Sequence, residues 1–231
     1  MFFLNPTYLL FMIPAFILMA LTSWYVKSAY AKWSRVAAGS RLSGYEATRR
    51  LISSNGLQGL QIQGTPGELS DHYDPRNKTL YLSNGVANSA SVAALAIAAH
   101  ELGHAQQDAE EYFPLKFRGT LVPMVNIGSN LGWILIMIGL VLKVTQIAWL
   151  GVIVFAGGAL FALVTLPVEL DASARARRML SNSGLIQTEN EMRGVSNVLN
   201  AAALTYVAGL VTAILQLLYY VTLVGGGRRR S

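Results

Sequence analysis

Around residue 100 the chain reads Ser91-Val92-Ala93-Ala94-Leu95-Ala96-Ile97-Ala98-Ala99-His100-Glu101-Leu102-Gly103-His104. The alanine-rich run predicts a helix that continues through both histidines, and residues four apart lie on one face of a helix. Both imidazoles can therefore bind one metal ion, and Glu101 can reach a water molecule on that ion. This is the H-E-x-x-H arrangement of zinc hydrolases.

The two histidines need a third ligand, because a catalytic zinc ion uses three protein ligands and leaves one position for water. The chain has one further histidine, His72, and the other candidate is Glu169. His104 precedes an apolar run and Glu169 follows another, so both are expected at the same membrane face. We therefore expect one Zn²⁺ per chain, held by His100, His104 and Glu169. Glu101 is expected to be the general base that takes the proton from water.

The composition predicts an integral membrane protein. The chain is 53% hydrophobic and only 13% charged, about half the charged fraction of a typical soluble domain. The first apolar run is too long for a cleaved signal peptide and has no basic residues before it, so we expect it to be retained. Four runs are long enough to cross about 30 Å of hydrocarbon and are predicted as transmembrane helices: 2–25, 121–142, 147–168 and 201–224.

Basic residues beside these runs predict the orientation. The positive-inside rule places segments 27–120 and 169–200 in the cytoplasm and both termini outside. The basic tail 225–231 does not follow this rule, so the side of Arg228 to Arg230 stays open. The basic residues do not form a stripe with interleaved aromatic residues, so the net charge of +6 does not indicate nucleic-acid binding. The chain has no cysteine, which excludes disulfides, cysteine metal ligands and cysteine nucleophiles.

Segment 27–120 is predicted to be a small α+β region. A soluble helix is expected over Ser43–Ile52, followed by a short β-hairpin with strands at Leu60–Gln63 and Thr79–Leu82, and the segment Asp71–Lys78 is expected to be a polar turn. Polar residues Gln106 to Glu111 mark the place where the active helix leaves the apolar interior. Many zinc peptidases bind peptide by strand addition to an edge strand beside the active helix. The candidate edge strand consists of Thr79, Leu80, Tyr81 and Leu82.

The second cytoplasmic segment, 169–200, is expected to hold two short helices separate from the spans, one ending at Gly184 and one over Glu189–Leu199. The expected fold class is therefore mainly α and integral to the membrane. About four transmembrane helices would accompany a zincin-like cytoplasmic region built from a short hairpin and the active helix.

Supporting residues can also be proposed near the motif. A metal-binding histidine needs a hydrogen-bond partner on its other ring nitrogen, and Ser173 or Asp171 can supply it. Asp171 can instead form a solvated i,i+4 ion pair with Arg175. The chemistry of three residues would allow them to stabilise the oxyanion: His72, Tyr206 and Arg175. The alternatives are a hydrogen-bonded turn residue for His72 and an interfacial aromatic residue for Tyr206.

Four segments in this order carry a resemblance to a known family: Asp71–Pro75, Ala98–Ala105, Thr165–Glu169 and Ala201–Ala208. They resemble the bacterial YugP-type neutral zinc metallopeptidases of the membrane, over nearly the whole chain. The resemblance implies a zinc-dependent peptidase of the bacterial plasma membrane. It carries the metal role onto the two motif histidines and the base role onto Glu101, with Glu169 at the position of the third carboxylate. Leu170-Asp171 departs from the phenylalanine–asparagine of the family. A more distant similarity is to the HtpX-type membrane proteases, whose site faces the cytoplasm.

The leading hypothesis is a multi-pass membrane zinc endopeptidase that acts on membrane-associated proteins at the cytoplasmic surface. A second is a catalytically silent membrane scaffold with a closed, structural zinc site that includes His72. A third is zinc-dependent hydrolysis of a non-peptide amide. The sequence leaves open the substrate, the cleavage preference, the oligomeric state and any adaptor.

Overall fold

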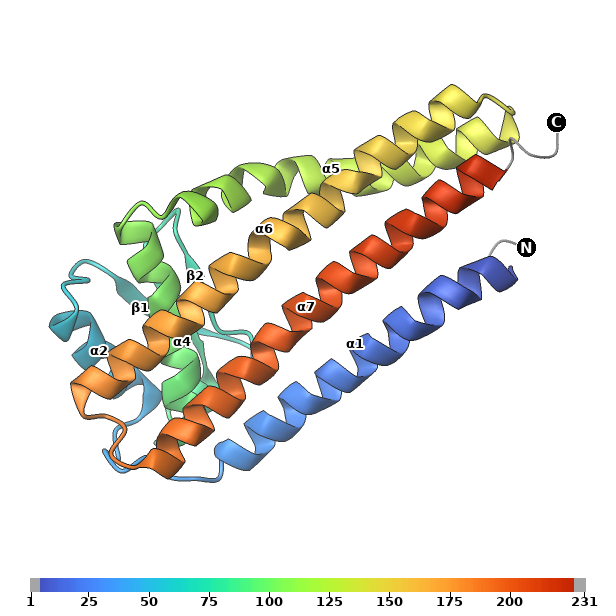
Figure 1. The fold of residues 1–231 in the computed structure, drawn as a ribbon. Coiled ribbons are helices and arrows are strands. Elements are labelled where there is room, and N and C mark those ends of the chain that lie inside the picture. The colour runs from blue at the N-terminus through green and yellow to red at the C-terminus, as the bar shows by residue number, and fades with distance from the viewer. Residues whose placement is uncertain (1–4, 227–231) are drawn as a thin grey trace. The chain divides into compact units, whose positions relative to one another are not determined.

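The computed structural model describes residues 5–226, which form seven helices and one three-stranded sheet (Figure 1). The helices are α1 (Pro6–Trp33), α2 (Gly44–Ser54), α3 (Asn84–Ala87), α4 (Val92–Ala109), α5 (Phe113–Val141), α6 (Thr145–Ser183) and α7 (Glu189–Gly226). The strands are β1 (Gln61–Thr65), β2 (His72–Asp74) and β3 (Thr79–Ser83). The start of the first predicted span, Phe2 to Leu4, and the tail arginines Arg228 to Arg230 lie outside the described residues.

The described chain divides into two compact units. Unit 1 comprises residues 5–22, 116–167 and 205–226, and unit 2 comprises 23–115 and 168–204. Within residues 5–226, four helices are long and apolar enough to cross a membrane, namely α1, α5, α6 and α7. The mainly helical fold with four apolar helices and a small sheet agrees with the expectation at that level.

The helices expected within 169–200 are not separate elements, because each is continuous with an apolar run. α6 continues without a break from Thr145 to Ser183, and α7 continues from Glu189 to Gly226. Around residues 169–178 and 199–203 the chain is rich in alanine, leucine and arginine, which are the strongest helix formers. A change from apolar to polar composition therefore does not end either helix. Gly184 lies just beyond the end of α6 with φ +68°, the left-handed conformation that commonly follows a helix.

In unit 1, α5 and α6 approach each other through small residues (Figure 1). A Cβ on Gly132 would lie 2.9 Å from the carbonyl oxygen of Gly151, and a Cβ on Gly139 would meet the backbone of Ala148. Small residues allow this kind of close backbone packing between membrane helices. Buried side chains of α5, α6 and α7 form a shared core that includes Ile136, Val152, Tyr219 and Val224.

In unit 2, α4 is the central helix. It packs against α2 and against β2 and β3, and its alanine-rich first half is buried (Figure 1). Ser91 caps its N-terminus by accepting a hydrogen bond from the Ala94 amide at 3.2 Å. The Val92 amide also donates to the Val36 carbonyl at 2.9 Å, which ties the start of α4 to the segment after α1. The helix with the histidines is therefore fixed at its N-terminal end.

The sheet differs from the predicted hairpin. Its strand order is β1-β3-β2, with β1 parallel to β3 and β2 antiparallel to β3. The hairpin joins β2 and β3, because the short turn after Asp74 suits an antiparallel pair. Parallel β1 and β3 require a longer crossover, which residues 66–78 provide. His72–Asp74 is thus a strand rather than part of a polar turn.

The position of β3 corrects the substrate-strand hypothesis. Thr79, Leu80 and Tyr81 lie at the centre of the sheet and pair with β1 on one side and β2 on the other, while Leu82 pairs with Gly64 of β1. Thr79, Leu80 and Leu82 are buried. A central strand has no unpaired edge, so this segment cannot accept an added peptide strand.

Candidate metal site

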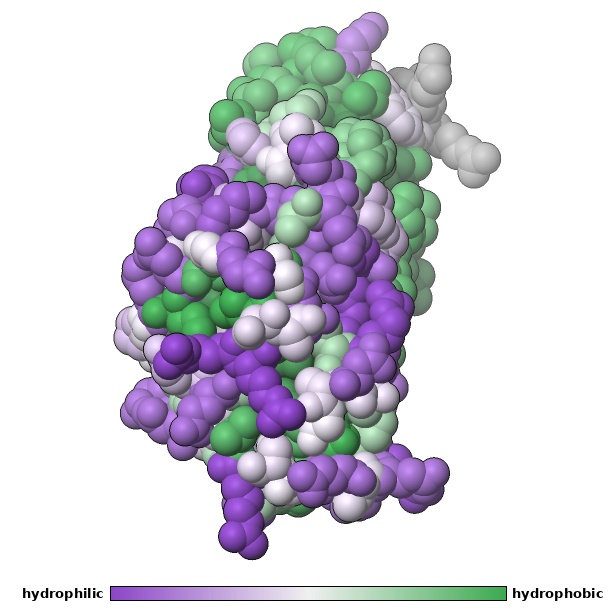
Figure 2. Space-filling model, turned by 90° about the vertical axis from the view of Figure 1, so that its left-hand side faces the viewer, coloured by the Kyte–Doolittle hydropathy of each residue, from purple (hydrophilic) through white to green (hydrophobic). Residues whose placement is uncertain are grey.

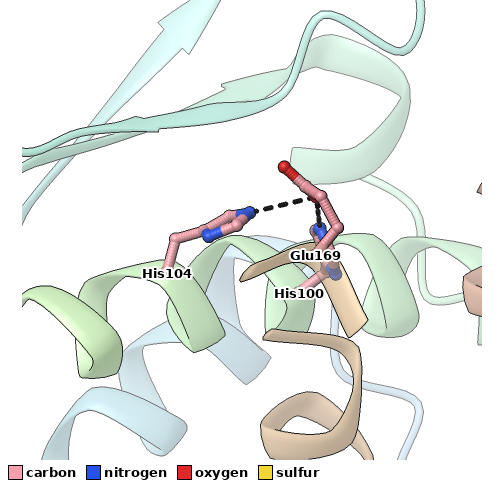
Figure 3. Close-up of side chains that lie close together, drawn as sticks. All are labelled: His100, His104 and Glu169. Carbon is pink, nitrogen blue, oxygen red and sulfur yellow. Dashed lines mark hydrogen bonds and ion pairs between the residues drawn. The ribbon is translucent and has the colours of Figure 1, made fainter. Parts of the chain in front are cut away.

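Three side chains from two helices converge in unit 2 (Figure 3). α4 provides His100 and His104, and α6 provides Glu169. The Glu169 Oε2 atom lies 3.3 Å from His100 Nε2 and 3.4 Å from His104 Nε2. The ligand atoms all lie within 4.8 Å of one another, and this is the group of potential metal ligands found among the described residues 5–226. The expected ligand set is therefore brought together.

The two separations from Glu169 Oε2 are compatible with zinc. Zinc binds histidine nitrogen and carboxylate oxygen at about 2.0–2.2 Å, so two ligand atoms at tetrahedral positions are about 3.3–3.5 Å apart. The measured separations of 3.3 and 3.4 Å from Glu169 Oε2 to the two imidazole nitrogens match this value. Two histidines and one carboxylate are also a donor set that zinc accepts. The residues present therefore fit the ion that the sequence predicts.

Gly103 explains how α6 comes near enough to deliver the carboxylate. A Cβ at this position would lie 2.5 Å from the Ala172 carbonyl oxygen. Side chains of ordinary size would therefore push α6 away from α4. The glycine inside the H-E-x-x-H motif thus allows the contact between helices on which the third ligand depends.

Both histidines are also held at their second ring nitrogen. His100 Nδ1 lies 3.2 Å from Ser173 Oγ, and His104 Nδ1 lies 3.0 Å from Gln107 Oε1. These contacts direct both Nε2 atoms toward Glu169. Ser173 lies where the sequence suggested a partner, whereas Gln107 was interpreted as a surface residue. That interpretation is wrong, because Gln107 is 0% exposed.

Comparison with known proteins gives the family. Residues 8–225 match the family described as "putative neutral zinc metallopeptidase". A relative from Bacillus subtilis (strain 168), named "Putative membrane protease YugP", is 40% identical over 203 residues. The match covers 88% of this chain and 90% of the relative. No solved structure matches.

The chain belongs to this zinc metallopeptidase family. The resemblance read from the four sequence segments is thereby confirmed, and membership supports a peptidase role and zinc as the metal. The roles of individual residues as metal ligands or general base stay predictions, which rest on the geometry described above.

In a zinc metallopeptidase, the glutamate after the first histidine is the natural candidate for the base. Glu101 is only 9% exposed. Burial raises the pKa of its carboxyl above the ordinary value, while positive charge on His100 and His104 opposes the shift. A raised pKa makes the carboxylate a stronger base near neutral pH. The environment of Glu101 therefore suits proton transfer.

Asp171 and Arg175 belong to a network beside the candidate metal site. Asp171 Oδ2 accepts from Gln107 Nε2 at 2.8 Å and from Arg175 Nε at 2.6 Å. Arg175 Nη1 donates to Glu110 Oε2 at 2.6 Å. Asp171 thus contacts Gln107, which is the partner of His104, and does not contact either histidine of the group directly. The Arg175 guanidinium binds two carboxylates, those of Asp171 and Glu110. This arrangement favours a structural role for Arg175 over oxyanion stabilisation.

The other oxyanion candidates, His72 and Tyr206, are not part of the ligand group. His72 lies on β2, and its Nδ1 atom is 2.8 Å from the Ser70 carbonyl oxygen. Its ring stacks on the Tyr81 ring, with centroids 4.6 Å apart. It is not a member of the three-residue group found among residues 5–226. Tyr206 belongs to unit 1, whereas the ligands belong to unit 2. Neither placement supplies an argument for an oxyanion role.

Proposed function

We propose that this chain is a zinc-dependent membrane endopeptidase that hydrolyses peptide bonds with Glu101 as general base. The observation that carries the proposal is the convergence of three ligand side chains, with Glu169 Oε2 at 3.3 and 3.4 Å from the two imidazole nitrogens and a buried glutamate next to the first ligand. Three protein ligands leave a fourth position for water or substrate, as in catalytic zinc sites. Family membership supports the peptidase class.

Each residue has a definite task in this proposal. His100, His104 and Glu169 would hold the ion through two imidazole nitrogens and a carboxylate oxygen. Bound there, Zn²⁺ would lower the pKa of water and polarise the scissile carbonyl. Glu101 takes the proton from the attacking water and passes it to the leaving amine. Ser173 and Gln107 keep the imidazole rings in place through Nδ1.

We assign peptide binding to the outer edge of β2 instead of β3. β2 packs against α4 and has one free edge in the described sheet. Asp71 directly precedes β2, and its negative charge adds to the effect of burial in raising the pKa of Glu101. The start of this edge is therefore close to the proposed base. An extended substrate paired with β2 would bind through main-chain hydrogen bonds, which favours a peptide over another amide.

The proposed location is the cytoplasmic surface of the bacterial plasma membrane. In α6, Glu169 directly follows the apolar segment that ends near Val168. Figure 2 shows the end of the molecule that carries α2 and the sheet, where hydrophilic side chains cover most of the surface. In contrast, the apolar helices of unit 1 expose large hydrophobic side chains, among them Met124, Ile127 and Ile153. These surfaces suit water for unit 2 and lipid for unit 1.

Glu101→Gln tests the mechanism. We expect the variant to keep its zinc, because the ligands are unchanged, and to lose cleavage of fluorescein-labelled casein. Glu189→Gln is the matched control, since the Glu189 side chain is 90% exposed and pairs only with the exposed Arg193 in the described structure. Metal content by mass spectrometry accompanies each assay. Full cleavage by zinc-loaded Glu101→Gln would overturn the proposed base.

The scaffold hypothesis gives a different result in the same experiment. A structural zinc site would bind metal in wild type and variant alike, and neither protein would cleave casein. It also requires a fourth protein ligand, and the group found among residues 5–226 contains three. A set of three protein ligands leaves a position for water or substrate, which favours catalysis over a scaffold.

The β2 assignment has its own test. A synthetic peptide that spans a mapped casein cleavage site is compared with copies N-methylated at alternate residues. Strand addition predicts strong loss of cleavage for one alternate set and little loss for the other, because only every second amide faces the strand. Equal rates for all copies would contradict pairing with β2.

A further inference from the structure

Gln107 is the most completely buried polar side chain beside the ligand group, and it makes more contacts than holding a ring in place requires. Its side chain extends from α4 to α6 and is 0% exposed. Its Nε2 atom is 2.8 Å from the Val168 carbonyl oxygen and 2.8 Å from Asp171 Oδ2. Its Oε1 atom is 3.0 Å from His104 Nδ1. One amide thus connects a histidine of α4 with two acceptors of α6.

These neighbours fix the orientation of the amide. A backbone carbonyl accepts hydrogen bonds and never donates them, and an ionised carboxylate behaves in the same way. Both acceptors must therefore face the NH₂ group of Gln107. A flipped amide would place its oxygen against two other oxygens in a buried site, which is strongly unfavourable. The carbonyl oxygen of Gln107 consequently faces His104.

The orientation of the amide in turn fixes the tautomer of His104. Because Gln107 Oε1 can only accept, His104 Nδ1 must carry a proton and donate it. A neutral imidazole with its proton on Nδ1 has its lone pair on Nε2. That atom lies 3.4 Å from Glu169 Oε2, inside the ligand group. His100 differs, because Ser173 Oγ can either donate or accept and so does not select a tautomer.

We infer that Gln107 is a positioning residue that presents His104 Nε2 to the metal by holding the proton on Nδ1. This inference rests on the proposed zinc function. Asp171 and Arg175 hold Gln107 in turn, since Asp171 Oδ2 accepts from both side chains and Arg175 also binds Glu110. Asp171 therefore acts on the metal site through Gln107. Loss of such an outer partner typically costs about 10–100-fold in metal affinity.

The test compares Gln107→Met with Gln106→Met. Methionine keeps the length of the side chain and removes its hydrogen bonds. Gln106 is the control because its side chain, as far as residues 5–226 show, donates to Glu110 Oε1 at 3.0 Å and not to a ligand or to α6. Zinc affinity is measured by competition with a chelator, which needs no substrate. We expect about 10–100-fold weaker binding for Gln107→Met and unchanged binding for Gln106→Met. Equal zinc affinity of Gln107→Met and wild type would overturn the inference.

A second measurement separates positioning from general stability. In zinc-loaded wild type, the His104 Nδ1 proton should give a slowly exchanging, downfield NMR signal with Nε2 as the coordinating atom. Gln107→Met should lose this protection, whereas a residue that only stabilises the fold would leave it. Coordination through Nδ1, or a rapidly exchanging Nδ1 proton in wild type, contradicts the inference even if the variant does not fold. Failure of wild type to bind zinc would instead contradict the proposed function.

Discussion

The carbonyl oxygen of Ala172 on α6 lies 2.5 Å from the point where a Cβ on Gly103 of α4 would stand. This contact sets the spacing of the two helices at the proposed metal site. Glu169 projects from α6 one turn before Ala172, so a shift of this contact moves the carboxylate away from both imidazoles. The motif therefore needs its glycine as well as its histidines.

Gly103→Ala should weaken zinc binding by at least about tenfold and destabilise the fold by about 1–3 kcal/mol, the usual cost of overpacking. The neighbouring atom is backbone and cannot rotate away, so α6 must move. Chelator competition and thermal unfolding measure the two effects. Gly209→Ala is the control, because nothing lies within 4 Å of a Cβ at that helical position. Unchanged zinc affinity in Gly103→Ala would show that α6 can shift without loss of the ligand.

Arg175→Met should lower stability by about 2 kcal/mol, because it removes two charge-assisted hydrogen bonds. The Arg175 side chain is 10% exposed and binds Asp171 and Glu110, the latter being half-exposed. The measurement is denaturant unfolding in detergent. Arg193→Met removes the exposed pair with Glu189 and should change stability by less than about 0.5 kcal/mol. Equal effects of the two substitutions would show that the contacts of Arg175 with Asp171 and Glu110 stabilise the fold no more than an exposed ion pair does.

Gly139→Leu should disrupt the packing of α5 on α6 in unit 1, because its Cβ would overlap the backbone of Ala148. We expect a lower unfolding temperature in detergent and faster proteolysis of α5. Gly157→Leu is the matched control, since a Cβ on Gly157 has no neighbour within 4 Å. If both variants unfold at the wild-type temperature, the contact between these glycine-rich faces does not contribute to stability.

The environment of Tyr73 predicts that the folded protein loses stability at alkaline pH. Its pKa is raised, first by burial and then by its hydrogen bond to Asp108 Oδ2 at 2.7 Å. The folded pKa thus exceeds the unfolded value of about 10. The stabilising contribution is complete below that unfolded value and is lost as pH rises through the folded pKa. Between pH 8 and pH 11, the unfolding temperature should fall less for Tyr73→Phe than for wild type. Equal falls would contradict this role of the tyrosine.

The sequence predicted the parts of the site that depend on local spacing. His100 and His104 are four residues apart, so any helix brings their side chains to one face. Glu169 could be chosen because it directly follows an apolar run. The four apolar runs could be predicted in the same way, since length and composition are local properties.

Other parts depend on contacts that no local pattern records. The parallel pairing of β1 with β3 is a non-local contact, and the polar strand His72–Asp74 has the composition of a turn. Gln107 lies in a polar series, and only the approach of α6 turns its position into a buried one. Its spacing of three residues from His104 was the available signal, because such residues share a helix face.

The ligands His100 and Glu169 are separated by 69 positions along the chain. A nascent chain that ends before residue 168 carries two of the three proposed ligands and none of the residues that hold Gln107 from α6. At about 5–20 residues per second, synthesis of the intervening segment takes roughly 3 to 14 s. During that time the proposed site is incomplete. The order of synthesis therefore postpones assembly of the proposed proteolytic centre until α5 and most of α6 have been made.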